Sequence, residues 1–258
     1  MREFGLTEAI TAAGGVTELA RKIGIAQPSL SNWTRVPAER VIAVEAVTGV
    51  SRTRLRPDLY AADSEGAAID EVDLARAREY ALLAALLVRA PDADVLQRLA
   101  GLKGDPSPLG IAHLALAEAA AATSADRVQR EYFDLFIGLG RGELMPYGSY
   151  YLTGFLHERP LARLREDLKG LGIARSEGSV EPEDHAAILC EIMAGLIEGR
   201  FAAAPGSDQR IFDRHLKPWI ARFFSDLEHA EKADFYARVG TVGRTFVEIE
   251  TEAFALPS

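Results

Sequence analysis

The stretch Glu181-Pro182-Glu183-Asp184-His185 stands where two kinds of sequence meet. A polar loop that contains glycine, 176–180, precedes it, and an apolar pattern of helical period follows it. Proline is favoured in the first turn of a helix, and the helix dipole favours acidic side chains there. The stretch therefore predicts the start of a helix over 184–200 and gathers three carboxylates at that point.

The composition of the whole chain favours an all-α fold. Alanine and leucine are abundant and β-branched runs are short, which favours helices over strands. No run approaches about 18 apolar residues without a charge, so we expect no membrane insertion. The N-terminus has no apolar signal core, which predicts a cytoplasmic protein. The single cysteine, Cys190, excludes disulfides within the chain, and its apolar neighbours predict that it is buried.

The charge is distributed unevenly along the chain. Residues 1–60 carry eight Lys/Arg and six Asp/Glu, whereas residues 61–258 carry 21 Lys/Arg and 32 Asp/Glu. Such asymmetry predicts two units with different partners. The strongly acidic second part suits a basic partner, although an acidic surface is also an ordinary means of staying soluble.

The helical patterns divide the chain into two domains. Residues 1–60 form short helices, expected at 6–13, 16–23, 27–34 and 38–48. Residues 61–71 are small and acidic without periodicity, which predicts a linker. Residues 72–258 form the larger domain, and Ser149 is expected to be a helix N-cap within it. Its helices are expected at 73–89, 94–102, 109–123, 124–137, 149–156, 160–171, 184–200, 208–230 and 232–254.

The segment from Thr17 to Trp33 has the features of two helices that meet at a turn. Small Ala20 lets the helices approach each other, and Gly24 allows the left-handed turn between them. A small core is expected from the apolar members of the segment, which are Leu19, Ile23, Ile25, Leu30 and Trp33. This pattern resembles a helix-turn-helix of the phage-repressor, Cro/YdaS-like kind.

The resemblance implies that residues 1–60 bind DNA through the outer face of the third helix. Glutamine and asparagine can bond adenine edges, whereas serine and arginine can bond phosphates or guanine. The predicted DNA-binding residues are Gln27, Pro28, Ser29, Ser31, Asn32 and Arg35. The balance of charge is low for phosphate binding, so a second interpretation is a helix-turn-helix kept only for docking or dimerisation.

Three short segments of the larger domain recur together in one known family. They are Leu135-Phe136-Ile137-Gly138, the run Pro146-Tyr147-Gly148-Ser149-Tyr150-Tyr151, and Glu181 to His185. In this order, on a helical background, they resemble the TorD/DmsD/NarJ family of chaperones for molybdenum-cofactor oxidoreductases. The segment Leu216-Lys217-Pro218-Trp219 also fits, whereas Leu139 stands where family members often carry proline.

The resemblance implies a partner and a site. Family members bind the twin-arginine signal peptide, or a neighbouring region, of an apo-molybdoenzyme until its cofactor has been inserted. Such a leader is basic at one end and apolar along its length, so an apolar groove with carboxylates at its rim would suit it. The predicted peptide-binding residues are Tyr147, Ser149, Tyr150, Glu181, Pro182, Asp184 and His185.

Other functions are compatible with the same residues. Taken alone, the stretch Glu181 to His185 is an ordinary helix start, and the tyrosines could equally be packing residues. A transcription regulator with a TorD-like sensor domain is the alternative function, and a hydrolase using His185 and Asp184 is a remote third. No metal-binding spacing, phosphate-binding loop or nucleophile elbow occurs, so the sequence predicts no enzyme, no metal and no cofactor.

Overall fold

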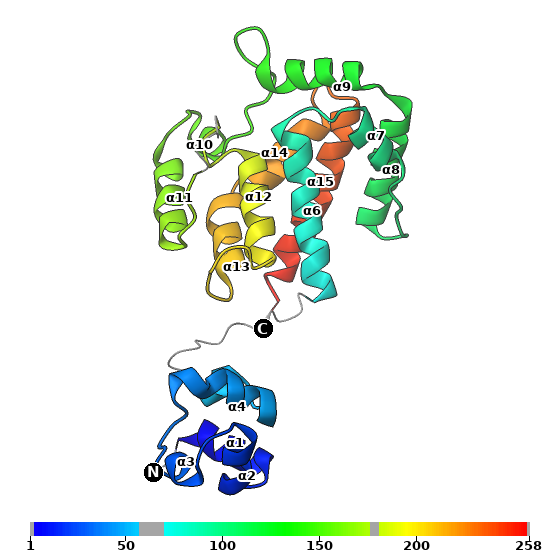
Figure 1. Cartoon of the computed structure of the whole chain (residues 1–258). Coiled ribbons are helices and arrows are strands. Elements are labelled where there is room, and N and C mark those ends of the chain that lie inside the picture. Colours follow the sequence, from blue (N-terminus) through cyan, green and yellow to red (C-terminus); the bar gives the residue numbers. More distant parts are fainter. Residues whose placement is uncertain (1–2, 57–69, 176–180, 257–258) are drawn as a thin grey trace. The chain divides into compact units, whose positions relative to one another are not determined.

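Helices make up every regular element of residues 3–56, 70–175 and 181–256, which are the residues that the computed structural model describes. The chain divides into two compact units, Met1–Ala68 and Ile69–Ser258, each with its own apolar core (Figure 1). The all-α fold predicted from the sequence is confirmed. The predicted linker, 61–71, lies for the most part outside the described residues.

The small unit is a set of short helices around one core. Gly24 has a φ of 71° and makes the turn between the second and third helices, as predicted. Leu19, Ile23 and Leu30 are buried, while Ile25 and Trp33 are partly buried against them. The helices are α1 (Phe4–Ala13), α2 (Val16–Lys22), α3 (Gln27–Ser31), η1 (Ala38–Arg40), α4 (Val41–Thr48) and α5 (Arg52–Leu55).

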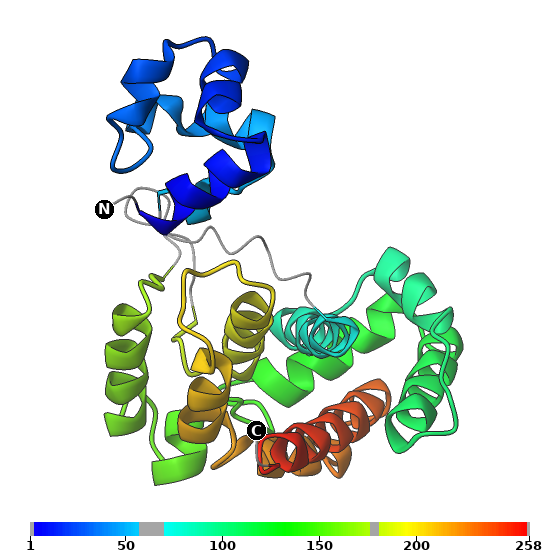
Figure 2. The same cartoon turned by 90° about the horizontal axis from the view of Figure 1, so that it is seen from below.

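The large unit is built around two pairs of helices that pack side by side. Helix α12 (Ala186–Ile197) packs along α6 (Glu71–Val88), and α14 (Ile220–Glu228) packs along α15 (Phe235–Ala253), which also contacts α8 (Pro108–Ala122) (Figures 1 and 2). The remaining helices are α7 (Ala93–Ala100), α9 (Ala125–Tyr132), η2 (Phe133–Ile137), α10 (Gly148–Thr153), α11 (Arg159–Gly170), α13 (Ser207–Ile211) and η3 (Phe212–Leu216).

The sequence explains which helices are central. Helix α12 is apolar on almost every side, and Leu189, Cys190 and Met193 are buried within it, as predicted for Cys190. Helix α15 approaches α14 closely because it carries glycine at the contact. A Cβ atom on Gly240 would lie 2.5 Å from the backbone nitrogen of Glu228, so only glycine fits there.

The prediction of one long helix over 208–230 is wrong. The chain instead forms α13, the π-helical turn η3 and then α14. The backbone nitrogen of Lys217 bonds the carbonyl of Phe212, five residues earlier, at 2.9 Å. Pro218 follows and has no N–H to continue the helical pattern, so a new helix starts after Trp219.

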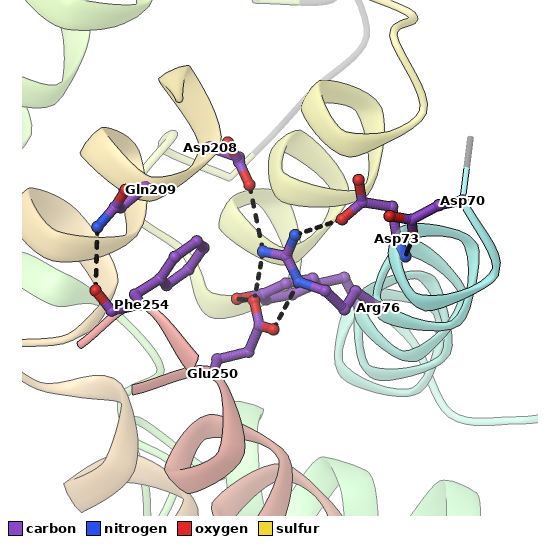
Figure 3. Close-up of polar contacts among 8 residues, drawn as sticks. Asp70, Asp73, Arg76, Asp208, Gln209, Glu250 and Phe254 are labelled. Atoms are coloured by element: carbon purple, nitrogen blue, oxygen red, sulfur yellow. Dashed lines mark hydrogen bonds and ion pairs between the residues drawn. The ribbon is translucent and has the colours of Figure 1, made fainter. Parts of the chain in front are cut away.

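A partly buried arginine, Arg76, ties three helices together at the end of the large unit where α6 begins and α15 ends (Figure 3). Arg76 of α6 bonds the carboxylate of Glu250 on α15 at 2.7 and 2.9 Å, and Glu250 is only 1% exposed. It also bonds Asp73 on its own helix at 2.7 Å and Asp208 on α13 at 3.2 Å. One guanidinium therefore holds three carboxylates from three helices.

Candidate peptide-binding site

The two sequence segments that define the candidate site are bonded directly to each other. The nitrogen of Gly148 donates to the carbonyl of Asp184 at 2.9 Å, and the nitrogen of Ala186 donates to the carbonyl of Pro146 at 2.8 Å. Tyr147 and His185 pair between these bonds as an isolated β-bridge. The starts of α10 and α12 are thus joined, although 35 or more residues separate them in the sequence.

Asp184 is a structural residue of this junction. Its Oδ2 accepts a hydrogen bond from the backbone nitrogen of Ser149 at 2.8 Å, and the residue is only 3% exposed. The carboxylate therefore satisfies a donor at the start of α10 and lies at its positive end. The prediction that Ser149 is the N-cap is wrong, because Tyr147 holds that position and Ser149 lies inside the first turn.

Two polar atoms at this junction lack a hydrogen-bond partner among the described residues. They are Oδ1 of Asp184 and Oγ of Ser149, and both are buried. Buried polar atoms are nearly always hydrogen-bonded, to protein, water or ligand. These two atoms therefore mark a place where a further polar group is expected to bind.

His185 begins α12 as a neutral side chain. Its Nδ1 accepts a hydrogen bond from the backbone nitrogen of Ala187 at 3.1 Å, so the proton is on Nε2. Burial lowers the pKa of His185 to about 4, despite the nearby carboxylates of Glu181 and Asp184. The ring of Tyr147 stands edge-on to it, with 5.1 Å between the ring centroids.

Each carboxylate of the stretch 181–185 makes at least one contact within the protein. Glu181 accepts a hydrogen bond of 2.6 Å from the hydroxyl of Tyr147, whose pKa is raised by burial and by that bond. Glu183 forms an ion pair of 2.8 Å with Arg165 of α11. With Asp184 also turned inward, these side chains do not form the open acidic rim expected from the sequence.

Tyr150 lies apart from the other predicted peptide-binding residues. Its hydroxyl accepts a hydrogen bond from Arg141, and the guanidinium carbon of Arg141 lies 5.2 Å from the centroid of its ring. Tyr150 borders a hollow of about 480 Å³ that does not include Asp184 or His185. The structure therefore brings together Tyr147, Ser149, Glu181, Pro182, Asp184 and His185, and places Tyr150 on a neighbouring surface.

A smaller hollow of about 180 Å³ borders Asp184 itself. Helix α11 and the turn η3 supply its other side, with His215 bonded to Asp167 at 2.6 Å. No motif in the sequence pointed to His215, because it joins the site only through the packing of η3 and α11. The hollow is lined by Gly148, Leu152, Pro160, Arg163, Leu164, Asp184, Arg214 and His215.

Helix α11 also borders a third hollow, which has a volume of about 360 Å³. Its lining includes the apolar side chains Leu168, Ile188 and Ile192 and several charged ones, which are Arg165, Arg175, Glu183, Glu191 and Arg200. Both this hollow and the one beside Asp184 touch the stretch 181–185.

The predicted DNA-binding residues are all exposed on the small unit. Each of Gln27, Pro28, Ser29, Ser31, Asn32 and Arg35 is exposed, on α3 or just after it. Several arginines of this unit are neutralised by carboxylates, in the pairs Arg21–Glu18, Arg52–Glu45 and Arg54–Glu8. Contacts to phosphate would therefore depend on few cations.

No group of three or more His, Cys, Asp or Glu in the described ranges is arranged to hold a metal ion. Among the helices described, none is both long and apolar enough to cross a membrane.

Comparison with known proteins connects each unit to a family. Residues 103–225 match the family described as nitrate reductase delta subunit, and residues 6–63 match the family described as bacterial toxin YdaS. Both families agree with the resemblances predicted from the sequence.

The individual relatives are named as chaperones. The chaperone protein TorD of Aliivibrio fischeri is 29% identical over 135 residues, which are 48% of this chain and 63% of that protein. A protein of Haemophilus influenzae named as a Tat proofreading chaperone, DmsD, is 31% identical over 111 residues, 42% of this chain and 53% of that protein. The chain thus spans less than two-thirds of the length of these relatives.

A solved structure of a redox enzyme maturation protein from Archaeoglobus fulgidus is also similar. The match covers 67% of this chain and 93% of the Archaeoglobus chain, with 22% sequence identity and a TM-score of 0.47.

Proposed function

We propose that this protein is a cytoplasmic maturation chaperone. Residues 103–225 match the family described as nitrate reductase delta subunit, and similar proteins are named TorD and DmsD chaperones. Its client is a molybdopterin oxidoreductase in its apo form, and it binds the twin-arginine leader or a neighbouring segment during cofactor insertion. It binds peptide and catalyses no covalent reaction.

The observation that supports peptide binding is the buried, partly unsatisfied carboxylate of Asp184. Its Oδ1 has no hydrogen-bond partner among the described residues, and the side chain borders a hollow. A bound leader offers the missing donor, either a backbone amide or a guanidinium N–H. The hollow of about 360 Å³ contributes apolar surface from Ile188 and Ile192, which suits the apolar part of the same leader.

Calorimetry of the full chain with synthetic twin-arginine leaders tests this proposal. Asp184→Asn keeps one acceptor oxygen for Ser149 but presents an N–H2 group in place of a charged acceptor, so we expect leader binding to weaken by about tenfold or more. Glu118→Gln, on the exposed side of α8, is the matched control and should bind as the wild type does. Failure of the wild type to bind any leader from its own genome would exclude the proposal.

Binding of DNA by the small unit is a second proposed function. It is supported by the shared exposure of the six predicted residues on and after α3, and by the match to the YdaS family. If binding of the client changes the affinity for DNA, the protein is also a regulator whose large unit is the sensor. Binding of DNA must then change the affinity for the client by the same factor.

Electrophoretic retardation of the protein's own promoter at low salt tests DNA binding. Replacing Gln27 and Asn32 by alanine removes two amides that can bond adenine, and binding should fall by about tenfold or more. Arg52→Ala is the control, because Arg52 is already paired with Glu45 at 2.9 Å. A promoter fragment that the wild type does not retard would show that the unit serves another purpose.

A further inference from the structure

The hollow of about 180 Å³ beside Asp184 has the size of a site for one side chain. Helices α10 and α11 pack against each other at one edge of the large unit, and η3 and the residue before α12 complete the walls of the hollow (Figure 1). Sites that take a whole small molecule usually have volumes of roughly 300–1,000 Å³. The hollow is smaller than these, so it suits a single functional group of a larger partner.

One wall of the hollow offers an acceptor that the described residues leave unused. Asp184 is 3% exposed, and its Oδ2 accepts a hydrogen bond from the backbone nitrogen of Ser149 at 2.8 Å. Its Oδ1 has no hydrogen-bond partner among the described residues, although Asp184 borders the hollow. Buried polar atoms are nearly always hydrogen-bonded. The occupant of the hollow should therefore bring a donor to Asp184.

Two guanidinium groups border the same hollow. Arg214 of η3 donates to Asp167 of α11 at 2.9 Å. Arg163 of α11 is exposed and forms no hydrogen bond or ion pair with the described residues. A guanidinium has five N–H donors and no acceptor. The occupant should therefore also bring an acceptor, which Arg163 can bond.

The charges around the hollow cancel. Arg163 and Arg214 are balanced by Asp184 and by Asp167, which also bonds His215 at 2.6 Å. A cation that entered the hollow would be repelled by the two arginines, and a carboxylate would be repelled by Asp184. Either ion would also lose its hydration without a full compensating charge. An uncharged group that both donates and accepts hydrogen bonds is therefore the complementary occupant.

We propose that this hollow binds a carboxamide of the client, namely the side chain of an asparagine or glutamine. The N–H2 group donates to Asp184 and the oxygen accepts from Arg163. The inference rests on the chaperone function proposed above and makes it more specific. Of the donors that a client offers to Asp184, the uncharged amide enters the hollow, and the guanidinium groups of the leader are excluded from it.

Three small compounds of similar shape and different charge test the proposal, and they are propionamide, propionate and ethylguanidinium. Each is titrated into the full chain, and NMR follows the amide proton of Ser149, which bonds Asp184. We expect propionamide to bind with a dissociation constant on the order of 10 mM, because so few atoms make few contacts. The two ions should bind about fivefold more weakly or not at all.

Two substitutions should change the preferred compound in opposite directions. Asp184→Asn removes a negative charge and presents a donor in place of the unused acceptor, so propionate should become the preferred compound. Arg163→Gln leaves negative charge in excess, so ethylguanidinium should be preferred. Arg159→Gln is the matched control, because it makes the same change at an exposed residue of α11 that does not border the hollow. It should retain the preference of the wild type for propionamide.

Three results would overturn the proposal. They are a Ser149 resonance that propionamide does not shift, which would mean that the hollow holds ordered water only, a wild type that binds either ion as tightly as propionamide, and an unchanged preference in both variants. Circular dichroism checks the folding of each variant, and the exposed Arg163 keeps the test decisive if Asp184→Asn does not fold.

Calorimetry with a leader peptide separates this inference from the proposed function. A protein that binds a leader but not propionamide would contradict the inference alone. A protein that binds propionamide but no leader would contradict the proposed function alone.

Discussion

At the scale of single residues, His185 makes the stability of the large unit depend on pH. Burial holds its pKa at about 4, below the ordinary value of 6.5, while Glu181 and Asp184 face it and oppose that shift. Between pH 6.5 and 4 the unfolded chain takes up a proton that the folded chain does not. Stability is therefore fully present above pH 6.5 and falls as the pH falls through this window, by on the order of 2–3 kcal/mol.

The variant His185→Gln tests this dependence. Glutamine does not titrate, so the variant should lose less stability than the wild type between pH 7.5 and 4.5, whatever its stability at neutral pH. Urea unfolding at several pH values, followed by the fluorescence of Trp219, measures the difference. Identical pH dependence in both proteins would show that His185 is not the titrating group.

At the scale of elements, the contact between α14 and α15 depends on glycine. A methyl group at Gly240 would press on the backbone of Glu228, 2.5 Å away, which cannot move without shifting α14. Gly240→Ala should therefore lower the free energy of unfolding by about 3 kcal/mol, although alanine favours helix. Gly170→Ala is the control, because Gly170 has open space around it and should tolerate alanine with a small gain. Similar melting temperatures for both variants would contradict the prediction.

The contact among α6, α13 and α15 depends on Arg76 in the same way (Figure 3). Removing the guanidinium leaves Glu250, 1% exposed, as an unpaired buried charge. Arg76→Ala should therefore cost about 3–5 kcal/mol in chemical denaturation, and replacing both residues by methionine should recover much of that loss. Arg200→Ala breaks a pair with Glu198 that is about as short, 2.7 Å, but partly exposed to solvent, and it should cost under about 1 kcal/mol.

The sequence predicts well those features that depend on neighbouring residues. It does not predict features that depend on contacts between segments far apart in the chain. Gly24 and Pro182 act on their own neighbours, so the turn after α2 and the start of α12 could be read from the sequence. The role of Asp184 could not, because the donor that it satisfies, the nitrogen of Ser149, is 35 residues away. The interruption of the predicted helix 208–230 was also missed, although Pro218 was a visible signal.

At the scale of the whole molecule, two separate cores imply two separate unfolding events. The core of the small unit contains Leu19 and Leu30, both fully buried, and that of the large unit contains Trp219. A unit of fewer than 70 residues buries a smaller share of its surface than a unit of about 190, so it has less stability to lose. We expect the small unit to unfold first on heating or in urea.

The two tryptophans allow each event to be followed alone, because Trp33 lies in the small unit and Trp219 in the large one. In a Trp219→Phe background, fluorescence reports the small unit, and in a Trp33→Phe background it reports the large unit. Leu19→Ala empties a fully buried position and should cost about 2–5 kcal/mol. The urea midpoint of the Leu19→Ala variant should fall sharply when Trp33 reports unfolding. It should stay unchanged when Trp219 reports unfolding. Equal shifts of the midpoint with both reporters would mean that the two units unfold together. The units would then be energetically coupled, as a sensor role for the large unit requires.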